Sequence, residues 1–154
     1  MTTPGITEAT GIKKILVPLD GSDYSLSAAG YAINLAAMTG AKVVCIHAVA
    51  TLPYMEHKSG IDILTPYLEE AGRHAELWYS QVNEMASEKG IQVESETLFN
   101  VASVADTIVQ YAREHGIDLI VMGTKGRTGL KKRLLGSVAS GVASHAGCPV
   151  LVVR

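Results

Sequence analysis

The residues best suited to chemistry in this sequence are three glycines and a serine near the C-terminus. Two residues separate Gly123 from Gly126, and nine more lead to the pair Gly136-Ser137. Gly123 lacks a side chain that would obstruct a ribose or a phosphate, and Gly126 lets backbone amides approach an anion. Gly136 and Ser137 begin a predicted helix, whose free N–H groups and positive dipole end face the same loop. The pattern therefore predicts a phosphate cradle.

Cationic side chains accompany this loop, because five of the 13 Lys and Arg residues fall within nine positions: Lys125, Arg127, Lys131, Lys132 and Arg133. They can supply charge to a bound phosphate, but such a run is also typical of a solvated loop face. The loop matches neither the Walker A sequence nor the dinucleotide-binding Gly-x-Gly-x-x-Gly. A surface loop that needs glycine only for its turns is the structural alternative.

Strand and helix patterns alternate along the rest of the chain. The predicted strands are Lys13–Leu19, Lys42–Ala48, Ile91–Leu98, Asp118–Met122 and Val150–Val153, and the predicted helices span 22–39, 65–90, 103–116 and 136–146. Ser22 and Ser103 are the expected N-caps, and Gly40 is an expected helix end. Trp78 lies on an apolar helical stripe and is assigned to the core. No element is assigned to Val49–Leu64.

This alternation predicts parallel strands joined by right-handed crossovers. We expect a flexible tail over residues 1–11 and one α/β domain over residues 12–154, with a doubly wound, Rossmann-like five-stranded parallel sheet of order 3-2-1-4-5 and helices on both faces. Ligands of such sheets bind where the strand order reverses, here between strands one and four. Asp20 ends the first strand, so its carboxylate would face Gly123 across a crevice, where it can bond ribose hydroxyls.

The composition excludes several classes of protein. A formal charge of −2 argues against nucleic-acid binding by charge alone. No apolar stretch is long enough to span a membrane, and the N-terminus lacks a secretory leader. The two cysteines, Cys45 in an apolar strand and Cys148 before Pro149, look unpaired and favour a cytoplasmic location. The five histidines show no metal-ligand spacing, and His47 is interpreted as a satisfied buried histidine.

With these motifs in place, residues 12–154 resemble the universal stress protein family, of the ATP-binding subclass. The resemblance rests on residues 15–22 (ILVPLDGS), the strand end His47-Ala48-Val49, residues 118–123 (DLIVMG), the glycine frame, and residues 148–153 (CPVLVV). It implies ATP, with Mg²⁺, as the ligand. It also implies a homodimer joined through Val150–Val153.

The resemblance assigns positions to the ligand as well. Pro18, Leu19 and Asp20 are expected to line the adenosine pocket, with Asp20 on the ribose, and the Ala48 backbone to meet adenine. Met122 and Gly123 are expected to pack on the nucleoside. The phosphate set is Gly126, Gly136, Ser137 and Val138, with Arg127 added from the basic run.

Three functions remain open at this point. The first is an ATP-binding stress-response or regulatory protein with little or no catalysis, which acts on a regulatory protein partner that the sequence does not identify. The second is a slow ATPase or a phosphoryl or adenylyl transferase, for which Lys125, Arg127 or Lys131 can supply charge but no base is found. The third is a protein-interaction module without nucleotide. No catalytic residue and no metal-ligating side chain is assigned.

Overall fold

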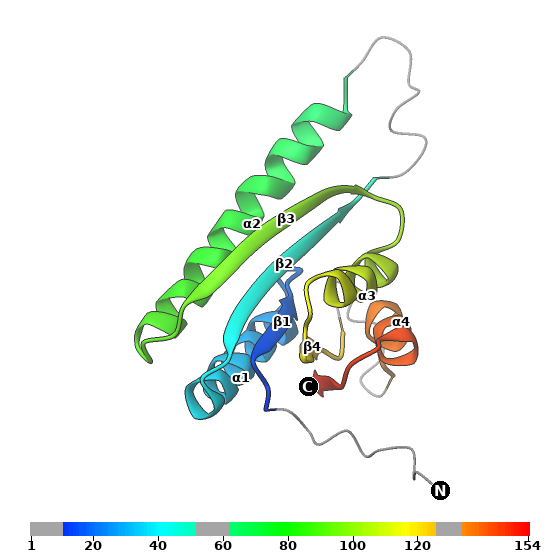
Figure 1. The fold of residues 1–154 in the computed structure, drawn as a ribbon. Helices are drawn as coiled ribbons and strands as arrows, with labels where there is room; N and C mark the ends of the chain where they lie inside the picture. The colour runs from blue at the N-terminus through cyan, green and yellow to red at the C-terminus, as the bar shows by residue number, and fades with distance from the viewer. Residues whose placement is uncertain (1–10, 52–61, 126–133) are drawn as a thin grey trace, which may run out of the picture.

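The computed structural model describes residues 11–51, 62–125 and 134–154. Strands and helices alternate from β1 to β5 (Figure 1), with these bounds: β1 Lys14–Pro18, α1 Asp23–Thr39, β2 Lys42–Ala50, α2 Leu64–Ser87, β3 Val93–Val101, α3 Val104–Glu114, β4 Leu119–Gly123, α4 Ser137–His145 and β5 Val150–Val153. The five strands form one parallel sheet of order β3-β2-β1-β4-β5. The predicted fold class and strand order are therefore confirmed.

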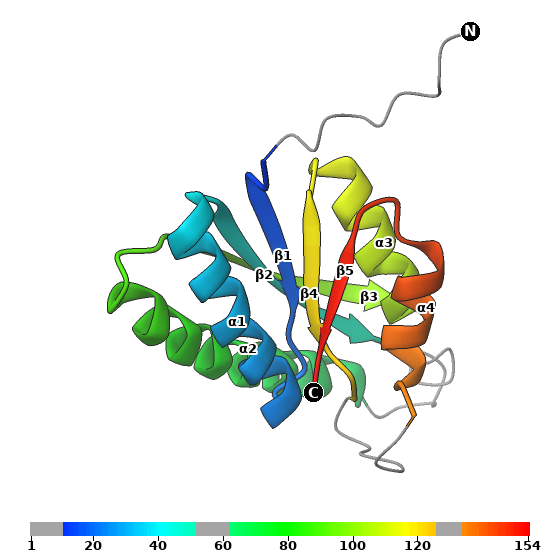
Figure 2. The ribbon, with the colours of Figure 1, turned by 90° about the horizontal axis from the view of Figure 1, so that it is seen from below.

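Two helices cover each face of the sheet (Figure 2), with α1 and α2 on one side and α3 and α4 on the other. Alternate residues of β1 supply the two cores. Ile15 and Val17 are fully buried against the first pair of helices, and Leu16 is fully buried against the second. A strand buried on both faces reads as a continuous apolar run, as this one does. Among the described residues, no helix is both long and apolar enough to cross a bilayer.

The helix ends follow local sequence signals. The Ser22 hydroxyl accepts a hydrogen bond from the Ser25 amide, the Ser103 hydroxyl accepts one from the Asp106 amide, and Gly40 has a left-handed φ of 74°. All three predictions are confirmed. The α2 helix begins at Leu64, so Pro66 lies in its first turn. There it removes no intrahelical hydrogen bond.

Two strands are longer than their sequence patterns suggest. β2 continues to Ala50 and β3 to Val101, because these strands pair with each other beyond the end of β1, with a register shift between Ala48 and Ala50. Val49 and Ala50, left unassigned by the sequence, therefore belong to β2. The rest of the unassigned segment is Thr51, Asp62, Ile63, the α2 residue Leu64, and residues 52–61, which lie outside the described part of the chain, as do residues 1–10 of the expected tail.

Cys45 and Tyr79 lie in the core between β2, β3 and α2. Cys45 is fully buried, and burial raises the pKa of its thiol to about 12, so it is the core thiol expected from the sequence. The Tyr79 hydroxyl donates to the Glu96 carbonyl at 2.8 Å and so attaches α2 to β3. Burial also raises the pKa of Tyr79 to about 12. Both cysteines are free thiols.

Gly123, the last residue of β4, is required by packing within the fold. A Cβ at this position would lie 2.8 Å from both the carbonyl carbon and the Cβ of Tyr24, in the first turn of α1. From the sequence alone, this glycine is explained by the space that a ligand needs. The structure adds a second reason, because the start of α1 rests directly on the end of β4.

We expect Gly123→Ala to lower the free energy of unfolding by about 1–3 kcal/mol, because backbone atoms of α1 must move to admit the methyl group. The matched control is Gly30→Ala within α1, where a Cβ would have no heavy atom within 4 Å. That change should stabilise the protein by about 0.5–1 kcal/mol, because alanine loses less backbone entropy in a helix. Urea unfolding of both variants measures whether each change lowers or raises the free energy of unfolding. Equal effects would contradict this account.

Candidate functional site

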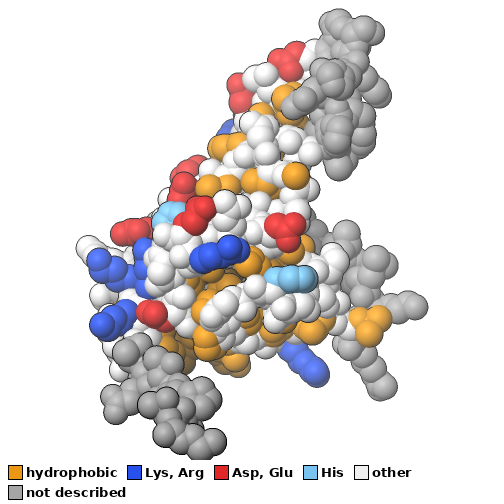
Figure 3. Space-filling model, turned by 45° about the vertical axis from the view of Figure 1, so that its right-hand side comes forward, with side chains coloured by type: hydrophobic (Ala, Val, Ile, Leu, Met, Phe, Trp, Pro, Cys, Tyr) orange, Lys and Arg blue, Asp and Glu red, His pale blue; other side chains and the backbone are white. Residues whose placement is uncertain are grey.

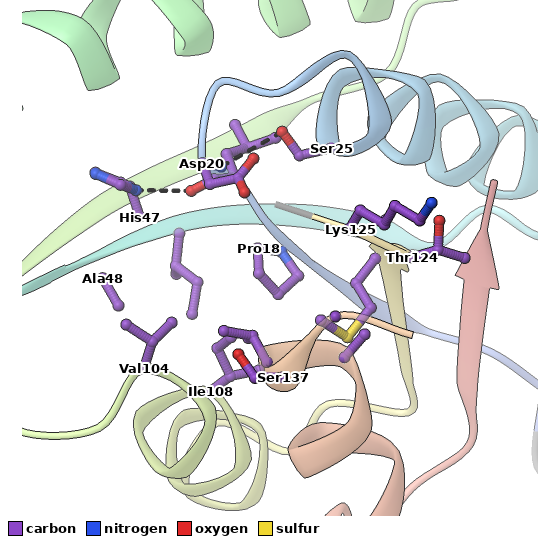
Figure 4. Close-up of a pocket in the computed structure, with 17 residues that line it drawn as sticks. Pro18, Asp20, Ser25, His47, Ala48, Val104, Ile108, Thr124, Lys125 and Ser137 are labelled. Carbon is purple, nitrogen blue, oxygen red and sulfur yellow. Dashed lines mark hydrogen bonds between the residues drawn. The ribbon is translucent and has the colours of Figure 1, made fainter. Parts of the chain in front are cut away.

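A cavity of about 300 Å³ opens at the carboxyl ends of β1 and β4, where the strand order reverses (Figure 4). Its lining contains these residues predicted from the sequence: Pro18, Leu19, Asp20, Ala48, Met122, Gly123, Gly136, Ser137 and Val138. Gly126 and Arg127, the other two, lie outside the described residues. Segments that are more than 100 positions apart in the sequence, such as Asp20 and Ser137, thus meet at one cavity.

One side of the cavity is apolar. Ile46 of β2, Met122 of β4 and the start of α3, with Val104 and Ile108, surround Pro18 at the end of β1. Ile46, Ile108 and Met122 are almost fully buried. A flat aromatic group can bury its faces between such side chains, since ligand sites are mostly apolar with a few polar groups that fix orientation.

Ala48 brings backbone polarity to this apolar side. The amide of Lys42 donates to the Lys13 carbonyl, and the carbonyl of Ile46 accepts from the Leu19 amide at 2.8 Å. The backbone N–H and C=O groups of even-numbered β2 residues therefore point toward β1. Since alternate residues share a direction, the N–H and C=O of Ala48 also point that way. These two groups of Ala48 lie beyond Pro18, the last residue of β1. A donor and an acceptor therefore stand side by side at the cavity.

The opposite side is formed by the N-terminus of α4. The first backbone hydrogen bond of this helix runs from Ser140 N–H to the Gly136 carbonyl at 2.9 Å. The N–H groups of Ser137, Val138 and Ala139 precede it and have no acceptor within the helix. All three residues line the cavity, and Figure 4 shows the start of this helix, with Ser137, at the cavity edge. The positive end of the helix dipole suits an anion at this place.

A backbone hydrogen bond holds this helix start against β4. The Gly136 amide donates to the Thr124 carbonyl at 2.6 Å, and the Thr124 amide donates to the Val153 carbonyl at 2.8 Å. The two ends of the glycine-containing segment are therefore joined directly, which fixes where α4 begins.

Asp20 lies between the two sides of the cavity. Its Oδ1 accepts from the Ser22 amide at 2.9 Å and from the Ser22 hydroxyl at 2.5 Å. Its backbone amide donates to the Ser25 hydroxyl at 3.4 Å, the contact drawn as a dashed line in Figure 4. A carboxylate at a strand end in a doubly wound sheet is well placed to bond hydroxyl groups of a ligand.

His47 lines the cavity, a role that the sequence did not reveal, and Trp78 packs on its ring. His47 Nδ1 forms a hydrogen bond with the Leu19 carbonyl at 2.7 Å, so this histidine is satisfied as predicted, but it is partly buried rather than buried. The Trp78 ring meets it edge to face, with centroids 4.9 Å apart. Trp78 packs against the core as predicted. A Cβ on Gly21 would lie only 2.2 Å from this indole.

Other lining residues were also missed or given only a general role: Ser25, Ile46, Val104, Ile108, Thr124, Lys125 and Ala139. Val104 and Ile108 lie on the helix predicted over residues 103–116, but the sequence does not show that this helix covers the ends of β1 and β2. Lys125, considered only as a source of charge, is 9% exposed. Among the described residues, no group of three His, Cys, Asp or Glu side chains is placed to hold a metal ion.

Comparison with known proteins adds to this geometry. The model of the universal stress protein family matches residues 11–154. The chain is 43% identical over 144 residues to universal stress protein MJ0531 of Methanocaldococcus jannaschii, covering 92% of this chain and 82% of that protein.

Among solved structures, it is similar to universal stress protein UspA from Lactobacillus plantarum, with a TM-score of 0.84, 30% identity, and 94% of this chain and 99% of that chain covered. It is also similar to a universal stress protein in complex with cAMP, with a TM-score of 0.71, 28% identity and the same coverage.

Proposed function

Because this chain belongs to the universal stress protein family, we propose that it is an ATP-binding regulatory protein of the ATP-binding subclass, with little or no intrinsic catalysis. The observation that carries the proposal is a single cavity with a helix N-terminus on one side and an apolar slot on the other. The cAMP complex of a similar universal stress protein supports an adenine nucleotide as the ligand.

The adenine base fits the apolar side. Adenine offers a ring nitrogen that accepts a hydrogen bond beside an amino group that donates one, and the Ala48 backbone offers the complementary N–H and C=O. Pro18, Ile46 and Ile108 supply apolar contacts for the faces of the ring. The base is thereby recognised by backbone groups at the end of a strand.

The ribose and phosphates fit the polar side. Asp20 accepts hydrogen bonds from the ribose hydroxyls, and Leu19, Met122 and Gly123 pack on the nucleoside. The amides of Ser137 and Val138, together with Gly136, hold the phosphates at the positive end of α4. Gly126 and Arg127 are proposed to complete the phosphate site.

Mg²⁺ is expected to arrive with ATP. Nucleotide-bound Mg²⁺ is held largely by phosphate oxygens and keeps several water ligands, so it needs few protein ligands. The lining fits this arrangement, since its described residues supply phosphate-binding amides and one carboxylate, Asp20. Two free cysteines are consistent with the cytoplasm, where we place the protein.

We propose further that two copies associate through β5, an edge strand of the sheet. Its sequence, VLVV, carries no charge, and Leu151 is 38% exposed. β3, the other edge strand, carries exposed Glu94 and Glu96, and such charges discourage strand pairing between molecules. We propose that nucleotide binding in the cavity changes the surface of the protein, and that a regulatory partner recognises this change.

ATP with Mg²⁺ is expected to raise the melting temperature. At a hundred times its dissociation constant, it adds about 2.7 kcal/mol of stability, or roughly 5–10 °C for a domain of this size. Gly136→Val should remove most of this shift, because its side chain blocks the phosphate amides while its φ of −60° remains accessible to valine. Calorimetry measures the shift, and a phosphate-release assay should show little turnover.

The control for this change is Gly147→Val, beyond the other end of α4. Gly147 is exposed, and a Cβ there would have no heavy atom within 4 Å. This variant should keep the full ATP shift. A wild-type protein that shows no shift, or a Gly136→Val protein that keeps it, would count against the proposed function.

The dimer is expected to depend on the outward amide of Val152. The carbonyls of Pro149 and Val153 accept from β4, so odd-numbered β5 residues face β4 and Val152 faces outward. Val152→Pro removes one outward donor without touching the β4 pairing. Native mass spectrometry should show a dimer for the wild type and a monomer for this variant. A monomeric wild type would contradict the interface.

A further inference from the structure

Ser22 uses its one hydroxyl group for two purposes. The hydroxyl donates to Asp20 Oδ1 at 2.5 Å and accepts from the Ser25 amide, in the first turn of α1, at 3.2 Å. A serine hydroxyl has a single hydrogen, so the second contact leaves that hydrogen directed at Asp20. The N-cap of α1 is thus also a support for the carboxylate.

Two further contacts close this arrangement into a ring. The Ser25 hydroxyl donates to the Ser22 carbonyl at 3.0 Å and accepts from the Asp20 amide at 3.4 Å. Ser25 is buried, with 4% of its surface exposed. The backbone and the side chain of Asp20 are therefore both held by the first residues of α1.

Gly21, between Asp20 and Ser22, is constrained by α2. Gly21 has φ of +80°, which favours glycine, and the Trp78 indole occupies the space where its Cβ would lie. The turn of Asp20, Gly21 and Ser22 cannot relax toward α2 without displacing that ring. Ser22 donates to Oδ1 through both its amide and its hydroxyl, and these two contacts help to fix the rotation of the carboxylate.

From this geometry we propose that Ser22 is a positioning residue that sets the discrimination between nucleotides with and without ribose hydroxyls. The inference rests on the proposed function, because it takes the ribose to lie on Asp20. Ser22 does not touch the nucleotide and acts through Asp20. A carboxylate that loses the Ser22 hydroxyl is held less firmly and bonds the ribose hydroxyls less well, whereas contacts with the base and phosphates are unaffected.

The test compares ATP with 2′,3′-dideoxy-ATP, which lacks both ribose hydroxyls, by isothermal titration calorimetry with Mg²⁺. For the wild type, the dideoxy nucleotide should bind about tenfold to a hundredfold more weakly, as expected for hydrogen bonds to a charged group. Ser22→Gly removes the hydroxyl donor and keeps the amide donor, so it should lower this ratio by about threefold or more, mainly by weakening ATP. Glycine is a tolerable N-cap, so α1 should remain folded.

Two variants serve as controls. Ser22→Thr keeps the hydroxyl and should keep the wild-type ratio. Ser103→Gly makes the same change at the N-cap of α3, where the serine hydroxyl accepts from the Asp106 amide at 3.3 Å and does not contact Asp20. It should also keep the ratio. Thermal melts confirm that each variant folds.

The outcomes separate the inference from the proposed function. If Ser22→Gly weakens both nucleotides equally, so that the ratio stays at its wild-type value, Ser22 has only a structural role and the inference is wrong. If wild-type protein binds ATP without preferring it to the dideoxy form, the inference is again wrong but nucleotide binding stands. If wild-type protein binds neither nucleotide, both proposals fail together.

Discussion

The early end of β1 is the constraint on which the site depends. β1 stops at Pro18, while its neighbour β2 continues to Ala50 with β3 as its partner. The cavity therefore opens beyond the end of β1. The backbone of β2 there no longer has β1 as a neighbour. The Leu19 carbonyl bonds the His47 ring, and the chain then turns at Gly21 into α1. On the face turned to the viewer in Figure 3, hydrophobic side chains lie exposed between charged ones in the region of α3 and α4.

The described polar groups of the site are positioned by β4, a neighbour of β1. The Thr124–Gly136 hydrogen bond sets α4 against β4, and the close contact between Gly123 and Tyr24 sets α1 against β4. The two helices that carry the polar groups are thus attached to the same strand. Their relative position follows from backbone contacts, which few side-chain substitutions alter. A site built in this way is largely formed before a ligand arrives, which lowers the entropic cost of binding.

Much of this could be predicted from the sequence, and for identifiable reasons. The caps at Ser22, Ser103 and Gly40 depend on neighbours in the chain, so short patterns were sufficient to find them. Parallel pairing followed from the alternation of strands and helices and the handedness of crossovers, whereas alternation alone does not select the order 3-2-1-4-5 from the doubly wound sheets. The contributions of Ile108 and His47 could not be found in this way, because they depend on which helix covers which strand end. The extra length of β2 and β3 arises from their mutual pairing, which no local pattern encodes. Gly123 was singled out from the sequence as a ligand-facing residue, but its contact with Tyr24 became visible only in three dimensions.

Trp78 gives this arrangement an experimental use. It is the one tryptophan in 154 residues, and it lies edge to face on His47, which lines the cavity, and against Gly21. Ultraviolet excitation at the long-wavelength edge of indole absorption therefore reports on a single, known place in the fold. Its emission wavelength and intensity follow the polarity and ring contacts around this turn, so the unlabelled protein contains its own fluorescent probe of the surroundings of His47 and Gly21.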